Sequence, residues 1–315
     1  MNFGESIKQE ILLKNIKERH CRKAFVAGII RGTGKLYEKD GELGLEFSVA
    51  DEQTAMLMTT TFRNLYNYEV REVSVEEDRL NKKDRFTLNV WGSQTEEILK
   101  SLGILVDNNG ELAVNLKFYG DITEKECCLH AFIRGLFLSV GSCTVPSKKD
   151  SSTGYHLEMV FSHYTPALET SEKLAEYNVL TKITRRRDSY IVYIKSAEEI
   201  KDFVAFLQAP VSVLKLTDLI IERELKNRSN RQKNCDIANV NKQVDAAAKQ
   251  IQAIEMIENT IGLDGLKSDL RNTAIMRKEN QDMSLNELAI ELGISKSCLN
   301  HRFRKLIAIA NEIKG

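Results

Sequence analysis

Apolar and polar residues alternate in two successive series of segments, and both series predict the same elements in the same order. After FVAGIIRGTG at 25–34, the pattern predicts a strand at 43–49, a helix at 54–66, strands near 69–75 and 85–90, and a helix near 94–102. After FIRGLFLSVG at 132–141, it predicts a strand at 155–161, a helix at 166–177, a hairpin of 182–187 and 190–194, and a helix at 197–207. The two opening stretches share a Phe and two Gly at identical offsets, 107 residues apart. We therefore expect two α+β repeats, at about 21–110 and 122–210, related by a pseudo-dyad.

The pattern changes at Thr217, beyond which no strand is predicted. The segment 226–239, KNRSNRQKNCDIAN, is polar and basic and is suited to a connection. Helices are predicted at 267–278 and from 284 to 313, and an apolar helical stripe that needs a partner precedes them, formed by Val240, Val244, Ala247, Ile251 and Ile254. We therefore expect a first domain at 1–216, a helical and basic linker at 217–240, and an all-α domain at 241–315.

Within the all-α domain, residues 283–306 (MSLNELAIELGISKSCLNHRFRKL) have the pattern of a helix-turn-helix, which we place at about 282–315. Ser284 with Glu287 forms a capping box that starts the first helix. Ala289 is a small residue where the helices cross, Gly293 suits the turn, and Leu299 is apolar on the second helix. The apolar face expected for the motif comprises Leu285, Leu288, Leu292, Ile294, Leu299, Phe303 and Leu306.

The opposite face of the second helix predicts contacts with DNA bases and phosphates. The candidate DNA-binding residues are Lys296, Ser297, Asn300, His301, Arg302, Arg304 and Lys305. The alternative is an ordinary helical hairpin whose basic face is only solvated. DNA binding is favoured because the turn glycine, the small residue and a basic helix without acids coincide.

Formal net charge is zero, from 45 basic and 45 acidic side chains, so local clusters must indicate any nucleic-acid partner. Two further clusters are candidates for contacts with a phosphate backbone: Lys182, Arg185, Arg186 and Arg187 in the predicted hairpin, and Arg228, Arg231 and Lys233 in the linker. With 42 % hydrophobic and 29 % charged residues, the composition is typical of a soluble globular protein. No apolar run approaches the ~18 residues of a membrane span, and the N-terminus lacks the apolar stretch of a signal peptide. We therefore expect a cytoplasmic protein without a membrane partner.

The candidate chemistry for metals and nucleotides is weak. The chain has six cysteines, of which Cys127 and Cys128 are adjacent, but it has no C-x-x-C pair, so we expect reduced thiols and no metal staple. GTGK at 32–35 resembles a phosphate-binding loop, but Ile29 and Leu36 stand where a Walker loop needs Gly and Ser or Thr. We predict no cofactor and no small-molecule substrate.

Each repeat opens with a helix that carries small residues four apart, Gly28 with Gly32 and Gly135 with Ser139. These helices resemble those of the LAGLIDADG homing endonucleases, in which two such helices, flanked by saddle-shaped sheets, hold a metal-binding acid before the last glycine of each motif. Thr33 and Val140 stand in those acid positions here, so we expect no catalytic residues and no nuclease activity. Asp40 and Asp150 lie beyond the helix ends, and nothing in their spacing makes them substitutes.

The chain as a whole resembles the WhiA family of bacterial regulators. The most specific stretches are Asn230-Arg231-x-x-Asn234-Cys235-x-x-Ala238-Asn239-x-x-Lys242, Ser284-Leu285-x-Glu287-Leu288 and Lys296-Ser297-x-x-x-His301-Arg302. The resemblance implies a fold of class α+β, with a pseudosymmetric, degenerate LAGLIDADG-like domain followed by an all-α helix-turn-helix domain. It also implies a nucleoid-associated, DNA-binding transcription regulator without nuclease activity, linked to sporulation, cell division or chromosome segregation.

The partner implied is double-stranded DNA at promoters or other chromosomal sites, and a protein co-regulator is a further candidate partner. Two other functions stay open at this point. An active endonuclease would nick DNA in the presence of Mg²⁺, and a protein-interaction scaffold would bind no duplex at physiological salt.

Overall fold

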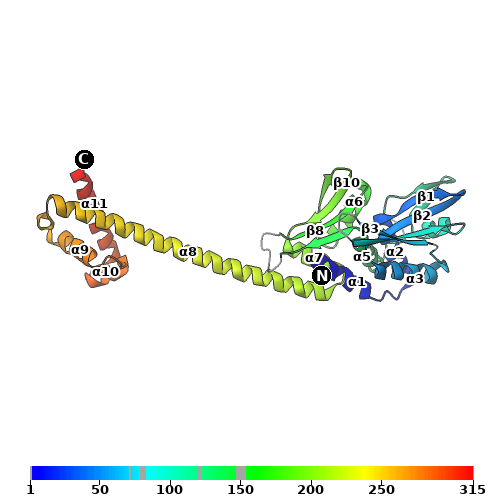
Figure 1. Ribbon diagram of the computed structural model, residues 1–315, viewed down its shortest axis with the longest axis horizontal. Coiled ribbons are helices and arrows are strands. Elements are labelled where there is room, and N and C mark those ends of the chain that lie inside the picture. Colours follow the sequence, from blue (N-terminus) through cyan, green and yellow to red (C-terminus); the bar gives the residue numbers. More distant parts are fainter. Residues whose placement is uncertain (1, 71, 79–82, 119–121, 147–153, 315) are drawn as a thin grey trace. The chain divides into compact units, whose positions relative to one another are not determined.

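The computed structural model describes residues 2–70, 72–78, 83–118, 122–146 and 154–314 (Figure 1). It divides into two compact units, Met1–Glu222 and Arg223–Gly315, and each is described by itself. The first unit contains the two repeats and the second contains the helix-turn-helix.

The first repeat comprises α1 (Phe3–Leu13), α2 (Arg19–Thr33), β1 (Lys35–Lys39), β2 (Glu42–Val49), α3 (Glu52–Tyr66), β3 (Glu72–Asp78), β4 (Lys83–Trp91), α4 (Thr95–Ser101), β5 (Leu105–Asn108) and β6 (Glu111–Val114). The second comprises α5 (Glu126–Val140), β7 (Gly141–Thr144), β8 (His156–Phe161), α6 (Tyr164–Ala175), β9 (Lys182–Arg186), β10 (Ser189–Ile194) and α7 (Ala197–Phe206).

The two four-stranded antiparallel sheets have equivalent strand orders, β1-β2-β4-β3 and β7-β8-β10-β9. This equivalence confirms the predicted pseudosymmetric α+β fold. The first strand of each sheet, α1 and the β5–β6 hairpin were not predicted from the sequence.

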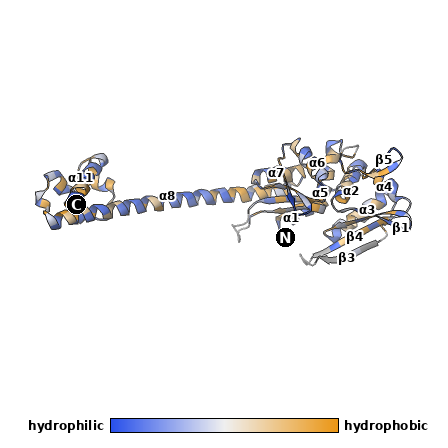
Figure 2. Cartoon of the chain, turned by 90° about the horizontal axis from the view of Figure 1, so that it is seen from above, coloured by the Kyte–Doolittle hydropathy of each residue, from blue (hydrophilic) through white to orange (hydrophobic). Residues whose placement is uncertain are grey.

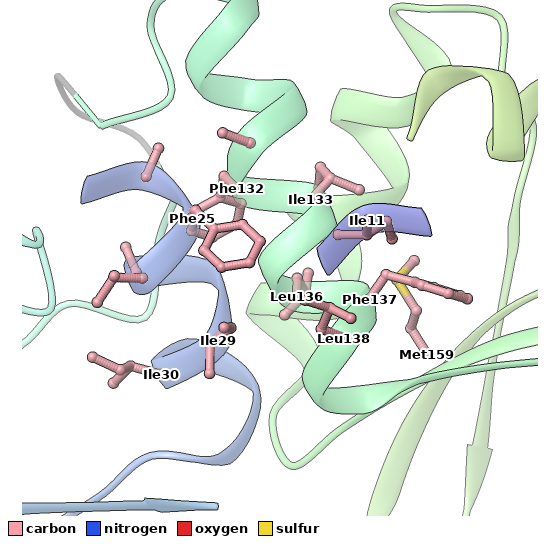
Figure 3. Close-up of a cluster of buried hydrophobic side chains, with 14 of the residues drawn as sticks. Ile11, Phe25, Ile29, Ile30, Phe132, Ile133, Leu136, Phe137, Leu138 and Met159 are labelled. Carbon is pink, nitrogen blue, oxygen red and sulfur yellow. The ribbon is translucent and has the colours of Figure 1, made fainter. Parts of the chain in front are cut away.

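The central helices α2 and α5 cross at Gly28 and Gly135. Figure 3 shows buried side chains of the two helices, among them Phe25 and Phe132, lying side by side. A Cβ on Gly28 would lie 2.1 Å from the carbonyl oxygen of Phe132, and one on Gly135 would lie 2.1 Å from that of Phe25. Only glycine permits so close an approach, because the obstruction at both positions is backbone. The small-residue spacing therefore has the packing role that the sequence predicted.

Each sheet turns one face to the core and the other to solvent, as strand alternation requires. In the first sheet Leu45, Phe47 and Leu88 are at most 1 % exposed, and in the second Leu157 and Met159 are fully buried. These side chains join those of α2 and α5 in one hydrophobic core. The outer faces carry mainly polar side chains, and the second sheet also places Val160 and Ile191 there.

Helix α8 (Pro210–Thr260) is 51 residues long, and the linker expected at 217–240 lies wholly within it. Pro210 suits the first position of a helix, where an N–H is not needed. Glu10 of α1 caps this end: its carboxylate accepts hydrogen bonds from the backbone N–H groups of Val211 and Ser212 at 2.8 and 2.9 Å. The middle of α8 is coloured mostly as hydrophilic in Figure 2.

The apolar stripe predicted along α8 finds a partner only at its C-terminal end. Ile254 is fully buried, but Val240 and Val244 are 57 % and 61 % exposed. The helices of the second unit cover the last turns of α8, so the N-terminal half of the stripe stays exposed within the described residues.

The second unit continues with the 3₁₀ helix η1 (Leu263–Gly265), α9 (Ser268–Glu279), α10 (Leu285–Glu291) and α11 (Lys296–Lys314). Its separate core includes Ile254, Leu288, Leu299 and Phe303. Arg277 lies within this core at 1 % exposure, and burial lowers the pKa of its guanidinium. No described helix of either unit is long and apolar enough to cross a membrane.

Candidate nucleic-acid interface

The helix-turn-helix begins with a complete capping box on α10. The N–H of Glu287 donates to Ser284 Oγ at 3.3 Å, and the N–H of Ser284 donates to a carboxylate oxygen of Glu287 at 2.7 Å. The hydrogen bond from the Ser284 N–H lowers the pKa of the Glu287 carboxyl because it favours the charged form, and the Ser284 side chain acts in the same direction. The capping box predicted from the sequence is therefore present.

The turn between α10 and α11 depends on Gly293, whose φ of 63° lies in the left-handed region. The N–H of Ile294 closes the turn by donating to the carbonyl of Ala289 at 2.9 Å. Leu288, Leu299, Phe303 and Leu306 are at most 2 % exposed, while Leu285, Leu292 and Ile294 are partly buried. The apolar face predicted for the motif therefore packs as a unit.

The polar side of α11 faces away from this core. Most of the predicted DNA-binding side chains are exposed there, namely Lys296, Ser297, His301, Arg304 and Lys305, and Asn300 is half-buried. We call Lys296, Ser297, Asn300, His301 and Arg304 the basic face of α11. Its helix has no acid before Glu312, so these groups meet no negative charge from their own helix.

Arg302 does not belong to this face. Its guanidinium lies 3.5 Å from a carboxylate oxygen of Asp269 on α9 and donates to the hydroxyl of Thr273 at 3.4 Å. Its side chain is only 18 % exposed. The geometry therefore assigns Arg302 to the packing of α11 on α9, which the sequence could not separate from the neighbouring cationic positions.

The second predicted cluster lies on the β9–β10 hairpin, at the edge of the second sheet. Lys182, Arg185, Arg186 and Arg187 are exposed. Arg186 approaches Glu158 of the adjoining outer face at 3.7 Å, and Arg185 stacks 5.8 Å from the ring centroid of Tyr190. Among the described residues, Lys182, Arg185 and Arg187 have no ion-pair partner, so the hairpin presents net positive charge.

The outer face of the first sheet forms a polar hollow that the sequence reasoning missed. Its lining includes Lys35, Tyr37 and Lys39 of β1, with Arg85, Asn89 and Trp91 of β4. Lys39 Nζ lies 4.4 Å from the ring centroid of Trp91, and Lys35 pairs with Glu46 at 3.7 Å. The alternation of cation, aromatic and cation at 35, 37 and 39 is the signal that could have identified this strand.

The third basic group, Arg228, Arg231 and Lys233, lies on the exposed middle part of α8. Arg228 and Arg231 line a shallow depression with Glu224, Asn227 and Gln232. These residues all belong to one helix, so they form a charged stripe rather than an enclosed site.

The ends of the central helices carry no carboxylate at the two motif positions. Thr33 Oγ1 donates to the carbonyl of Ser48 at 2.8 Å, and Val140 is a half-buried hydrocarbon. Asp40 occupies the exposed turn between β1 and β2, whereas Asp150 lies outside the described residues. Because GTGK follows α2 and leads into β1, it also has the reverse of the strand-to-helix order that a Walker loop needs.

The two units define a class of protein in which a LAGLIDADG-like α+β domain precedes a helix-turn-helix domain. Three family profiles match successive parts of the chain: the WhiA N-terminal LAGLIDADG-like domain over 19–105, the WhiA LAGLIDADG-like domain over 129–226, and the WhiA C-terminal HTH domain over 229–310. The chain belongs to the WhiA family.

Relatives named probable cell division protein WhiA align with the whole chain. The protein of Caldicellulosiruptor saccharolyticus is 33 % identical over 317 residues, covering 100 % of this chain and 96 % of the relative. That of Staphylococcus carnosus is 33 % identical over 318 residues, covering 100 % and 98 %. The crystal structure of full-length DUF199/WhiA from Thermatoga maritima, 24 % identical, aligns over 99 % of both chains with a TM-score of 0.59, which shows a shared fold.

Proposed function

We propose that this chain is a sequence-specific DNA-binding transcription regulator without nuclease activity, associated with the nucleoid in the cytoplasm. Its targets are promoters or other chromosomal sites that serve cell division, chromosome segregation or sporulation. The observation that carries the proposal is the basic face of α11, exposed on a capped helix-turn-helix. The relatives named as cell division proteins support the cellular process.

Sequence readout is assigned to the N-terminal half of α11. In a helix-turn-helix the second helix enters the major groove and its first turns reach the base edges. Lys296 and Ser297 lie in the first turn of α11, and Asn300 and Arg304 follow at helical spacing on the same side. An amide suits adenine and a guanidinium suits guanine, because each can form two hydrogen bonds with the base edge.

Contacts with the DNA backbone are assigned to the other basic groups. The β9–β10 hairpin, with Lys182, Arg185 and Arg187, and the basic group of Arg228, Arg231 and Lys233 on α8 would lengthen the footprint. If about six phosphates are neutralised, a plot of the logarithm of the association constant against the logarithm of the salt concentration should have a slope of about −5. A slope close to zero in a salt titration would contradict this part of the proposal.

The target site should first be found by sequencing DNA fragments crosslinked to the protein in cells. Binding of full-length variants to that site and to a scrambled duplex then tests the readout. Asn300→Ala and Arg304→Ala should each weaken specific binding by about 1–3 kcal/mol and relax base preference. Lys314→Ala, at the far end of the same helix, is a matched control and should change neither.

Two outcomes would replace the proposal with another function. If the Asn300→Ala and Arg304→Ala variants bind both duplexes as the wild-type protein does, α11 is not the helix that reads the DNA sequence. Absence of duplex binding at physiological salt by the wild-type protein would favour a protein-interaction scaffold, and a protein co-regulator would then be the main partner.

Loss of nuclease activity is assigned from the donor chemistry at Thr33 and Val140. A hydroxyl already bonded to a carbonyl and a hydrocarbon cannot supply the anionic oxygens that hold a divalent metal beside a scissile phosphate. Supercoiled plasmid incubated with the protein and Mg²⁺ should remain intact. Nicking that persists in a highly purified preparation would overturn this assignment.

A further inference from the structure

Four metal-ligating side chains meet at the beginning of the two central helices. His20 and Cys21 come from the first turn of α2, and Cys127 and Cys128 come from the first turn of α5. Their ligand atoms all lie within 4.8 Å of one another. His20 Nδ1 lies 3.1 Å from Cys128 Sγ and 3.3 Å from Cys21 Sγ.

The pseudosymmetry explains why these residues meet. The offset of 107 residues that relates Phe25 to Phe132 also relates His20 to Cys127 and Cys21 to Cys128. Since α2 and α5 cross at equivalent glycines, equivalent positions about two turns earlier approach each other as well. The cluster therefore lies on the pseudo-dyad and draws two ligands from each repeat.

We propose that His20, Cys21, Cys127 and Cys128 form a Cys₃His site for Zn²⁺. Three thiolates and one imidazole are an established donor set for tetrahedral zinc, with bonds of about 2.0–2.3 Å. Such bonds place the ligand atoms about 3.5–3.8 Å apart, so small side-chain rotations suffice to close the cluster. Cys21 and Cys128 are buried, whereas His20 and Cys127 reach solvent, which leaves a path for the ion.

The surrounding charge suits such a centre. Zn²⁺ with three thiolates carries a net charge of about −1, which the neighbouring cations would balance. Arg134 of α5 is 5 % exposed, and its Nη1 has no hydrogen-bond partner among the described residues. Burial lowers the pKa of its guanidinium, and a charge on Cys21 acts in the opposite direction. A buried cation without an anionic partner is costly, so a negative centre nearby would offset that cost.

The site would also complete two helix ends. Neither α2 nor α5 has a side-chain hydrogen bond at its N-cap, where Glu18 and Lys125 stand. An anionic centre in the first turn of both helices interacts favourably with their N-terminal dipoles. The bound ion would cross-link α2 and α5 through its coordination bonds at their N-terminal ends, opposite the ends that carry Thr33 and Val140. This structural role is independent of DNA binding.

The test measures metal in the full chain. Protein purified under reducing conditions, loaded with Zn²⁺ and freed of excess ion, should retain about one equivalent. Co²⁺ in place of Zn²⁺ should give thiolate-to-cobalt charge transfer and the intense visible bands of tetrahedral coordination. Cys127→Ser and His20→Ala change accessible positions and should retain less than about a tenth of an equivalent with an unchanged circular dichroism spectrum.

Two further variants sharpen the result. Cys127→His keeps a ligating side chain at the same place and should restore tetrahedral Co²⁺ binding. Cys235→Ser removes an exposed thiol of α8 and should leave metal content unchanged. The proposal is overturned if wild-type protein retains no zinc, if Cys127→Ser retains as much as Cys235→Ser, or if mass spectrometry finds Cys21 in a disulfide with Cys127 or Cys128 in freshly isolated protein.

Discussion

The buried Arg277 offers a sharp test of what holds the second unit together. Its Nε donates to Gln250 Oε1 of α8 at 3.0 Å, and its Nη1 donates to the carbonyl of Met283 at 2.7 Å. Longer hydrogen bonds reach the carbonyls of Asn280 and Gln281, and the guanidinium carbon lies 5.5 Å from the ring centroid of Phe303 on α11. One side chain therefore connects α8, α9, the α9–α10 loop and α11.

Substitution Arg277→Met keeps an apolar stem of similar length but removes every donor. At least two buried acceptors lose their partner, and each costs about 1–3 kcal/mol. Relief of the desolvation of the buried cation offsets part of this cost. We expect a net loss of about 3 kcal/mol in the free energy of unfolding of the second unit, because two or more neutral acceptors lose their hydrogen bonds.

Hydrogen exchange followed by mass spectrometry on the full chain separates the two units. A loss of about 3 kcal/mol should accelerate exchange of the slowest amides in α9, α10 and α11 by roughly a hundredfold, and leave those of α2 and α5 unchanged. The matched control is Arg271→Met on the same helix. Arg271 pairs with Asp264 at 2.8 Å, but the two side chains are 48 % and 86 % exposed, so the cost should be below about 1 kcal/mol. Equal exchange in the two variants would refute the reasoning.

Three other predictions concern the crossing of the central helices, the capping box of α10 and the cap of α8. Gly135→Ala should destabilise the first unit by about 2 kcal/mol or more in urea unfolding, because its Cβ would meet backbone, whereas Gly154→Ala, with open space around it, should have little effect. The pKa of Glu287 is lower in the folded protein than its ordinary value of 4.5. The carboxylate therefore stabilises the fold at pH values above 4.5, and this stabilisation is lost as the pH falls through the pKa of the folded state. The difference in melting temperature between wild type and Glu287→Gln should therefore shrink from pH 7 to pH 3, and a constant difference would contradict this origin. Glu10→Ala should release the cap of α8 and speed amide exchange in its first turn, with a cost of about 1 kcal/mol.

Local patterns in the sequence were sufficient for much of the fold. The strands and helices of both repeats follow from alternation and helical spacing, and the helix-turn-helix follows from Ser284, Gly293 and Leu299. Short edge elements escaped because strands such as β1 and β7, of five and four residues, carry too few alternations to stand out. The missed β1 is the strand that supplies Lys35 and Lys39 to the hollow of the first sheet.

Tertiary partners were beyond the reach of such patterns. Arg302 and Arg304 are two residues apart and chemically identical, yet one pairs with Asp269 and the other is exposed. The direction of each side chain depends on where α9 packs, which no local spacing encodes. The same limit applies to Val240, which belongs to the predicted apolar stripe but is 57 % exposed, because the second core of the described residues begins further along α8.

The cysteine cluster shows most clearly how symmetry creates a site that local spacing cannot reveal. A zinc motif is usually recognised from ligands a few residues apart, and the only close thiols here, Cys127 and Cys128, are adjacent. The remaining ligands come from the other repeat and approach only because glycines let α2 and α5 cross closely. The glycine crossing that a nuclease scaffold uses to bring two acids together at one end thus brings thiols and an imidazole together at the other. Changing the crossing by Gly135→Ala should therefore weaken the cluster's hold on Zn²⁺ as well as the packing of the core.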